Sequence, residues 1–360
     1  MILKNYQKYL IKVFISNFAL VALVFFSLSF VLNIFEEIKY FENINVNIFF
    51  PLLLTLLNTP SILLELLPFI FLISSMFFFI FLYDRDELEI LVNNGINYLK
   101  VVIILSLLSF IIGLITILFY YTFSAKLKSH YLIMKNKFST GNEYLAIVND
   151  SGLWIKEEVN GNINIINAQK FKQNTLENIT ITQVNKEFKT TNTVISTDAD
   201  ISKKLWKLNN VKMYVQDGTN KTINSYNYKS FFNGEMIANL FSNLNSLNLF
   251  ELHQLSENYA QIGYSTTDVK VHLNKIYSLP IYILLMTIIG ALMMIRLKFL
   301  TSKFFTLIIG VFISVVVYYL NYFSSLFGLN EMIPLELSVW LPIILLLLIC
   351  SIGIVRINEL

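Results

Sequence analysis

The chain has 360 residues, of which 55% are hydrophobic and 14% charged, and its formal net charge is +3. A globular domain normally carries about 25% charged residues, so this composition indicates a membrane protein and excludes most soluble enzymes. The small net charge provides no strongly basic surface, so we expect no nucleic acid as a partner. The single cysteine, Cys350, excludes a disulfide within the chain and disfavours a cysteine-based metal site.

Six apolar runs are long enough to cross a bilayer, which needs roughly 20 helical residues. They cover about 13–35, 51–82, 101–123, 276–295, 304–326 and 335–355. The first run is too long and too bulky for a signal peptide, so we predict a retained span. The second contains Pro51, Pro60 and Pro68, which predict a broken or tilted helix whose first part lies in the outer interface.

Basic residues near the span ends predict the topology. One side collects nine of them, whereas the loops 36–50 and 327–334 opposite hold only Lys39. The nine are Lys4, Lys8, Lys12, Arg85, Lys100, Arg296, Lys298, Lys303 and Arg356. Because cytoplasmic loops carry the excess of basic residues, we expect both termini in the cytoplasm. The long polar segment 124–274 would then lie outside, in the periplasm of a cell with two membranes.

In the loop after the second span, an acidic stretch predicts a short cytoplasmic helix over 84–97. Asp84 or Asp86 can cap the helix, apolar residues recur at helical spacing, and Gly95 is a natural C-terminal stop. This pattern fits an ordinary solvated helix or a helix that docks into a groove of a cytoplasmic partner.

The polar segment has the pattern of a β domain. Alternating apolar residues predict strands at 152–156, 162–166, 179–184, 194–199, 204–208 and 211–216. Turns are expected at Asn160-Gly161, Asn209-Asn210 and Asp217-Gly218. Many short strands without cysteines favour a sandwich or jelly roll. Alternate residues would line its interior, as ordinary core or as a lining for apolar ligand chains: Leu153, Ile155, Ile163 and Ile165.

Three lysines lie at the expected outer face of the membrane. Lys39 is either an interfacial anchor or a partner for a phosphate group of an amphiphilic substrate. Lys126 and Lys128 follow the third span at the same face. Glu65 is a carboxylate within the second span, and its role stays unassigned.

The sequence contains none of the common catalytic or phosphate-binding motifs. It has no G-x-x-x-x-G-K-[ST] loop and no G-x-S-x-G, and its three histidines are scattered. We therefore expect no enzyme activity, no cofactor and no metal site. Energy for uphill transport would come from a partner or an ion gradient.

The order of these features resembles the permease subunits of the lipopolysaccharide exporter, the LptF/LptG family, over nearly the whole chain. The local matches are Leu67-Pro68-Phe69, then Asp84-Arg85-Asp86-Glu87-Leu88 with Gly95, then Gly152-Leu153-Trp154-Ile155-Lys156, and Lys275-Ile276-Tyr277-Ser278-Leu279-Pro280. Trp154 and the fourth-span match favour LptG. The implied fold has six transmembrane helices (3+3) and an inserted periplasmic β-jellyroll-like domain: spans one to three in 1–123, the β domain in 124–274, and spans four to six in 275–360.

The resemblance implies a transport subunit of the bacterial inner membrane that is not an enzyme. Its expected partners are a paralogous LptF-like permease, a dimeric cytoplasmic LptB-like ATPase, periplasmic LptC/LptA-like bridge proteins, and lipopolysaccharide in the membrane. The coupling helix would sit in a groove of the ATPase through Arg85, Glu87, Leu88, Leu91 and Gly95. Lys39 falls on the first of two adjacent lysines that face substrate phosphates in LptG relatives, and Tyr40 stands at the second.

Two other classes of protein share parts of this pattern. A mechanotransmission-type membrane protein would pass ATP energy outward without itself carrying lipid, but such proteins usually have fewer spans. A membrane-bound enzyme or sensor is disfavoured, because neither a catalytic motif nor a cytoplasmic output domain is present.

Overall fold

The computed structural model describes residues 4–42, 44, 46–136, 138, 153–159, 162–172, 174–184, 190–215, 220–230, 232–234, 237, 243–261, 265–297 and 302–358. The chain forms two compact units, a membrane unit of residues 1–128 and 270–360 and an inserted unit of residues 129–269. Several sequence features lie outside the described residues: the turns at Asn160-Gly161 and Asp217-Gly218, Gly152, and the side chains of Arg296 and Lys298.

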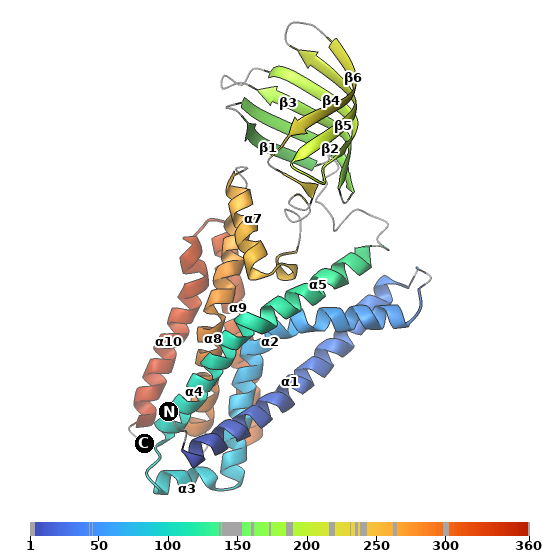
Figure 1. Cartoon of the computed structure of the whole chain (residues 1–360). Coiled ribbons are helices and arrows are strands. Elements are labelled where there is room, and N and C mark those ends of the chain that lie inside the picture. Colours follow the sequence, from blue (N-terminus) through green and yellow to red (C-terminus); the bar gives the residue numbers. More distant parts are fainter. Residues whose placement is uncertain are drawn as a thin grey trace. The chain divides into compact units, whose positions relative to one another are not determined.

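Six of the described helices are long and apolar enough to cross a membrane, which confirms the two predicted groups of three. The first three spans are α1 (Asn5–Tyr40), α2 (Phe49–Asp84), and the continuous run of α4 (Tyr98–Ile115), η1 (Thr116–Tyr120) and α5 (Tyr121–Asn136). The last three are α8 (Thr267–Leu297), α9 (Lys303–Leu329) and α10 (Leu335–Asn358). The short α3 (Glu87–Asn93) joins α2 to α4 (Figure 1).

The second span is one continuous helix through its two internal prolines, and Figure 1 shows it bent along its length. Proline removes a backbone donor and presses on the preceding turn, which accounts for a bend near Pro60 and Pro68. The Tyr120 hydroxyl donates to the Pro60 carbonyl oxygen at 3.0 Å. Because Tyr120 belongs to η1, a π-helical turn, the irregular segments of the second and third spans contact each other.

The fourth span, α8, is the most buried of the six, and small residues bring α2 and α4 close to it. Thr287 on α8 is hydrogen-bonded to Ser109 on α4, with 2.9 Å between their hydroxyl oxygens. The Ser75 hydroxyl on α2 donates to the Thr287 carbonyl oxygen at 2.9 Å. Without a hydrophobic driving force between helices in lipid, such close contacts and hydrogen bonds hold spans together.

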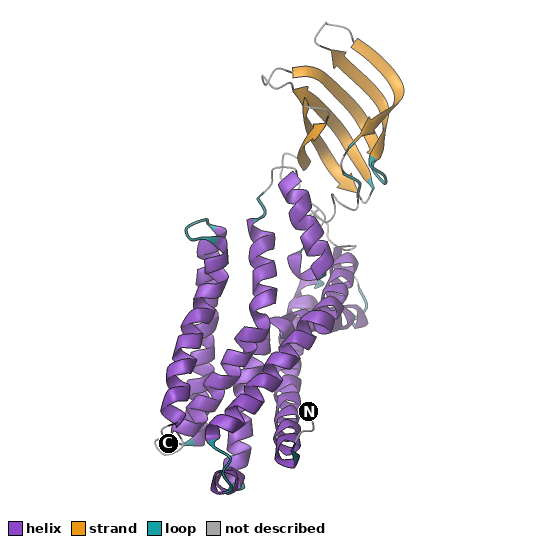
Figure 2. Cartoon of the chain, turned by 60° about the vertical axis from the view of Figure 1, so that its left-hand side comes forward, coloured by secondary structure: helices purple, strands orange, loops and turns teal. Residues whose placement is uncertain are grey.

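The inserted unit contains one antiparallel sheet whose six described strands follow the order β1-β2-β3-β4-β5-β6. The strands are β1 (Leu153–Val159), β2 (Asn162–Lys172), β3 (Thr175–Val184), β4 (Thr190–Asp200), β5 (Leu205–Val215) and β6 (Asn220–Lys229). Figure 2 shows that the sheet is curved. The sheet confirms the prediction of a β domain inserted between the third and fourth spans. It is followed by η2 (Leu244–Ser246) and α7 (Leu249–Gln261).

The turn predicted at Asn209-Asn210 is wrong, because both residues lie inside β5. Asn210 has a φ of 51°, in the left-handed region that asparagine tolerates better than most residues. Strand pairing with β6 continues on both sides, through Asn209 with Ser225 and Val211 with Ile223. Asn210 therefore interrupts the extended conformation of β5 without ending the strand.

We expect Gly290→Ala to destabilise the membrane unit by about 1–3 kcal/mol, the usual cost of overpacking. A Cβ at Gly290 would lie 2.5 Å from the Leu72 carbonyl oxygen, which moves only if α2 moves. Gly353→Ala is the matched control, because the nearest atoms there belong to the flexible end of the Leu292 side chain. The measurement is the temperature at which the full-length protein in detergent loses its monodisperse chromatographic peak. Equal midpoints for the two variants would contradict this packing.

Candidate functional site

The first candidate site is α3 and its flanks, the expected coupling helix. It has seven residues and is shorter than the predicted range 84–97, because Asp86 before it has a left-handed φ of 55° and makes no side-chain cap. Gly95 has a φ of 79°, and its N–H donates to the Val92 carbonyl while the Ile96 N–H donates to the Leu91 carbonyl. This is the Schellman arrangement, which confirms Gly95 as the helix stop.

The residues predicted to couple the chain to an ATPase have different surroundings. Leu88 is fully buried among the core residues of the membrane unit, so its side chain anchors α3 and is not on the surface. Leu91 is half-buried. Arg85 is exposed, and its guanidinium lies 4.1 Å from the centre of the Phe81 ring. Glu87 is half-buried and accepts a hydrogen bond of 2.7 Å from the Tyr9 hydroxyl of α1.

The exposed apolar side chain of α3 is Ile90, which is 57% exposed and which the sequence analysis did not single out. The exposure of Ile90 could have been predicted from its position in the helical pattern. Ile90 is out of phase with Leu88 and Leu91, so it lies on the other side of a helix that they anchor. Glu89 beside it is also exposed.

The three lysines predicted to bind substrate are not equivalent. Lys39, near the end of α1, and Lys126, on α5, are exposed. The Lys128 ammonium is half-buried and donates to Asn58 Oδ1 of α2 at 2.5 Å, and Asn58 in turn donates to Asn33 Oδ1 of α1 at 3.2 Å. Lys128 is therefore linked to α2 and α1 through the side chains of Asn58 and Asn33, both of which are buried. Binding of phosphate by any of these lysines stays a prediction.

The four residues predicted to line one β interior lie on two faces, so that part of the prediction is wrong. Leu153 and Ile155 are buried, whereas Ile163 and Ile165 are half-buried. In the β1–β2 ladder Ile155 pairs with Ile166, while Ile165 pairs with Lys156. Directly paired residues share a face, so the true partners of Leu153 and Ile155 are Ala168 and Ile166. Contact of any of these residues with lipid stays a prediction.

The buried face of the sheet also holds a polar cluster that sequence reasoning missed. Glu157 on β1 is only 2% exposed. Its carboxylate accepts hydrogen bonds from the Tyr228 hydroxyl at 2.6 Å and the Ser230 hydroxyl at 2.8 Å. Asn164 on β2 donates to the Tyr228 hydroxyl at 2.8 Å. We call these four residues the Glu157 cluster. The signal was Glu157 itself, which continues the buried alternation of Leu153 and Ile155.

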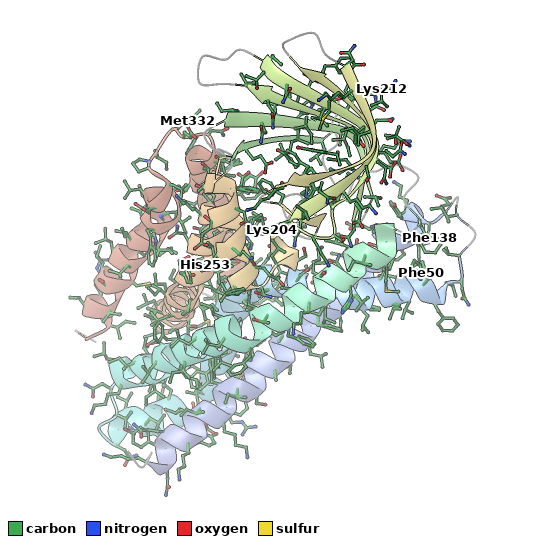
Figure 3. All side chains as sticks on the ribbon, turned by 45° about the horizontal axis from the view of Figure 1, so that its top comes forward. Phe50, Phe138, Lys204, Lys212, His253 and Met332 are labelled. Carbon is green, nitrogen blue, oxygen red and sulfur yellow. The ribbon has the colours of Figure 1, made fainter. Side chains whose placement is uncertain are left out.

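The Glu157 cluster joins strands from opposite ends of the sheet order. β1 is the first strand and β6 the last, yet Tyr228 on β6 contacts Glu157 on β1, so the sheet curls until the side chains of its two edge strands meet. Burial, and then the negative charge of Glu157, raises the pKa of the Tyr228 hydroxyl, so the hydroxyl stays a donor to Glu157 over a wider alkaline range than an exposed tyrosine. Lys212 on the opposite face of β5 is exposed and points away from the sheet (Figure 3).

Glu65, left unassigned by the sequence, lies inside α2 with an exposed side chain, and its role stays unassigned.

Tyr228→Phe should destabilise the β sheet by about 1–3 kcal/mol, because it leaves a buried carboxylate oxygen and the Asn164 amide without their partner. Hydrogen–deuterium exchange of the full-length protein should show faster exchange of the β1 and β6 amides. Tyr226→Phe is the matched control, since Tyr226 lies two residues earlier on β6 and is half-buried. Equal rates of amide exchange in the two variants would show that the Glu157 cluster does not stabilise the sheet.

Comparison with known proteins tests the layout of the whole chain. The family model for the lipopolysaccharide export system permease LptF/LptG matches residues 8–356, which includes all six spans and the inserted sheet. Comparison with individual curated proteins gives no match. The family match does not distinguish LptG from LptF, so the preference for LptG stays a prediction. The chain belongs to the LptF/LptG family of permeases, and is thus a multi-pass inner-membrane protein with a role in lipopolysaccharide export.

Proposed function

We propose that the chain is one of two related permease subunits that take lipopolysaccharide from the outer leaflet of the inner membrane. The observation that carries this proposal is the family match over residues 8–356 of a chain with six spans and one inserted sheet. In this proposal the domains are 1–123, 124–274 and 275–360. Both termini and α3 are cytoplasmic, and the β domain is periplasmic.

The second permease subunit would cover α1 and α9. These two are the least buried of the six spans. α9 also carries three exposed tyrosines, Tyr318, Tyr319 and Tyr322. A hydroxyl facing hydrocarbon lacks a hydrogen-bond partner and is unfavourable there. Exposed spans with polar groups support contact with another subunit or with the polar part of a lipid.

A separate, dimeric ATPase would supply the energy, because the sequence has no nucleotide-binding loop. The proposed docking element is α3, with Arg85, Glu87, Leu88, Leu91 and Gly95 shaping it. The support is physical: Leu88 anchors the helix, the Schellman stop fixes its end, and Ile90 remains exposed. A short rigid helix with one exposed apolar side chain suits binding in a groove.

On the outer side, Lys39, Lys126 and Lys128 are the proposed contacts for lipid phosphates, and the β domain is the proposed route toward periplasmic β-jellyroll bridge proteins. Each of the edge strands β1 and β6 pairs with a single neighbour in the described sheet. An edge strand of this kind can accept a strand from another β protein. Each acyl CH₂ exposed to water costs about 0.8 kcal/mol, so an apolar interior that shields the chains would contribute more than any single polar contact.

The experiment that tests this function is purification of the full-length protein in mild detergent, followed by mass spectrometry of bound proteins and lipids. We expect a nucleotide-binding subunit, a second six-span permease and a lipid-A-type glycolipid. Reconstitution of that complex should give release of lipopolysaccharide that requires ATP. Recovery of the ATPase without glycolipid, or of neither, would contradict the proposal.

We expect Ile90→Asp to weaken binding of the ATPase by about 1.5–3 kcal/mol, the free energy of burying one large aliphatic side chain. The matched control is Met332→Asp, which also places a charge at an exposed apolar position, but in the turn between α9 and α10. The amount of ATPase that co-purifies with each variant is the measurement. Equal recovery of the ATPase with both variants would show that Ile90 is not part of the docking surface.

A further inference from the structure

The buried face of the β sheet carries a row of polar side chains that crosses four neighbouring strands. In this row each residue pairs directly with the next across β1, β2, β3 and β4. Directly paired residues share a face, and this is the face on which Glu157 and Asn164 are buried. We call these four residues the polar row: Glu157, Asn164, Gln183 and Asn192.

Two apolar rows lie beside the polar row on the same face. Residues two apart along a strand point to the same side, and each row is about 7 Å from the next. On the other side of the polar row, all four strands end within two residues. The seven residues that form the apolar rows are all buried: Ile155, Ile166, Ile181 and Val194, then Leu153, Ala168 and Ile179.

The orientation of the Asn164 side chain is determined by the Glu157 cluster. The Tyr228 hydroxyl has a single hydrogen, which it donates to Glu157. Its oxygen therefore accepts from Asn164, which fixes Nδ2 of Asn164 toward Tyr228. Asn164 is only 1% exposed, and no donor among the described residues forms a hydrogen bond with its Oδ1. Asn164 Oδ1 is thus a buried acceptor on the polar row.

A second acceptor of the same kind lies on β4. Asn192 Nδ2 donates to Gln183 Oε1 at 3.4 Å, whereas Asn192 Oδ1 is buried and receives no hydrogen bond within the part of the chain that the structure describes. β2 and β4 are separated by one strand and lie about 10 Å apart. A buried polar atom without a hydrogen bond is unfavourable. The polar row therefore has two positions for a hydrogen-bond donor from outside the chain.

A hydroxyl group on an aliphatic chain has the chemistry that this face lacks. It supplies the missing hydrogen on one small oxygen. An amide would also bring a carbonyl that needs its own donor, and an ammonium group would bring a charge next to apolar rows. Because the apolar rows lie on one side of the polar row only, the hydroxyl belongs near one end of the chain.

We propose that the polar row is a binding site for hydroxyl groups near the ends of aliphatic chains, with Asn164 Oδ1 and Asn192 Oδ1 as the acceptors. This inference rests on the proposed function, in which the β domain shields the aliphatic chains of a lipid. It adds selectivity to that shielding. A hydroxylated chain contacts the polar row and the apolar rows, whereas an unsubstituted chain contacts only the apolar rows.

The test uses two probes, methyl 3-hydroxytetradecanoate and methyl tetradecanoate, which differ in one hydroxyl and have no other hydrogen-bond donor. Each is added to the full-length protein in a detergent that has no hydroxyl groups. The measurement is the probe concentration that gives half of the maximal protection of β2 and β4 amides from hydrogen–deuterium exchange. We expect this concentration to be about fivefold lower for the hydroxylated ester, the scale of one hydrogen bond.

Three variants locate the preference. Asn164→Leu and Asn192→Leu each remove one acceptor and should reduce the preference, and the double variant should bind both esters equally. Asn192 lies outside the Glu157 cluster, so Asn192→Leu tests the polar row even if Asn164→Leu does not fold. Asn227→Leu is the matched control, because Asn227 is an exposed asparagine of β6, and it should keep the fivefold preference.

The proposal is overturned if both esters protect the wild-type strands at the same concentration, since water would then serve the two acceptors. A preference that survives in the double variant would also overturn it. Absence of protection by either ester would overturn it together with the proposed lipid route through the β domain. Failure of transport itself looks different: the complex would show no ATP-dependent release, whereas binding of the esters is measured without the ATPase.

Discussion

The close approach of α2 and α4 to α8 is the contact on which the membrane unit depends. Spans satisfy their backbone groups internally, and lipid is as apolar as leucine, so burial of apolar surface does not by itself drive helices together. Gly290 and Ser75 allow α8 and α2 to approach within backbone contact, and the hydrogen bond between Thr287 and Ser109 fixes α8 against α4. With α8 as the buried centre, α1 and α9 are the least buried of the six spans.

Two other groups of polar side chains also join elements that are distant in sequence. Lys128 and Asn58 connect α5 with α2 and, through Asn33, with α1. Glu157 connects the first and last strands of the sheet. A buried carboxylate is unfavourable unless donors surround it, so the two hydroxyls that contact Glu157 specify one curvature of the sheet. The cluster thus links the first and last strands on the buried face of the sheet.

The sequence predicted the parts of the fold that repeat along the chain. Span length, proline positions and alternating strands are local properties, which is why all six spans and the inserted sheet are confirmed. Register is not local. Assigning Ile163 and Ile165 to the interior required the offset between β1 and β2, and a shift of one residue moves every side chain to the other face. The Asn209-Asn210 turn failed for a related reason, because asparagine at a positive φ is compatible with a turn or with an interruption inside a strand.

The candidate sites, too, depend on contacts that local sequence patterns do not reveal. The pattern around Asp84-Arg85-Asp86-Glu87-Leu88 identifies a short helix between the second and third spans, and the structure contains one. The pattern does not indicate which side chains face outward, because that depends on a first turn that Asp86 distorts. The pattern groups Leu88 with the docking residues although its side chain is buried, and it does not single out Ile90, whose side chain is exposed. The pattern also does not indicate that the Glu87 carboxylate accepts a hydrogen bond from Tyr9, which is 78 residues away in sequence, and docking of Glu87 on a partner stays a prediction. A carboxylate has two oxygens and accepts several hydrogen bonds, so the contact with Tyr9 within the chain is compatible with a second contact on a partner, and only the first of these contacts is visible in a single chain.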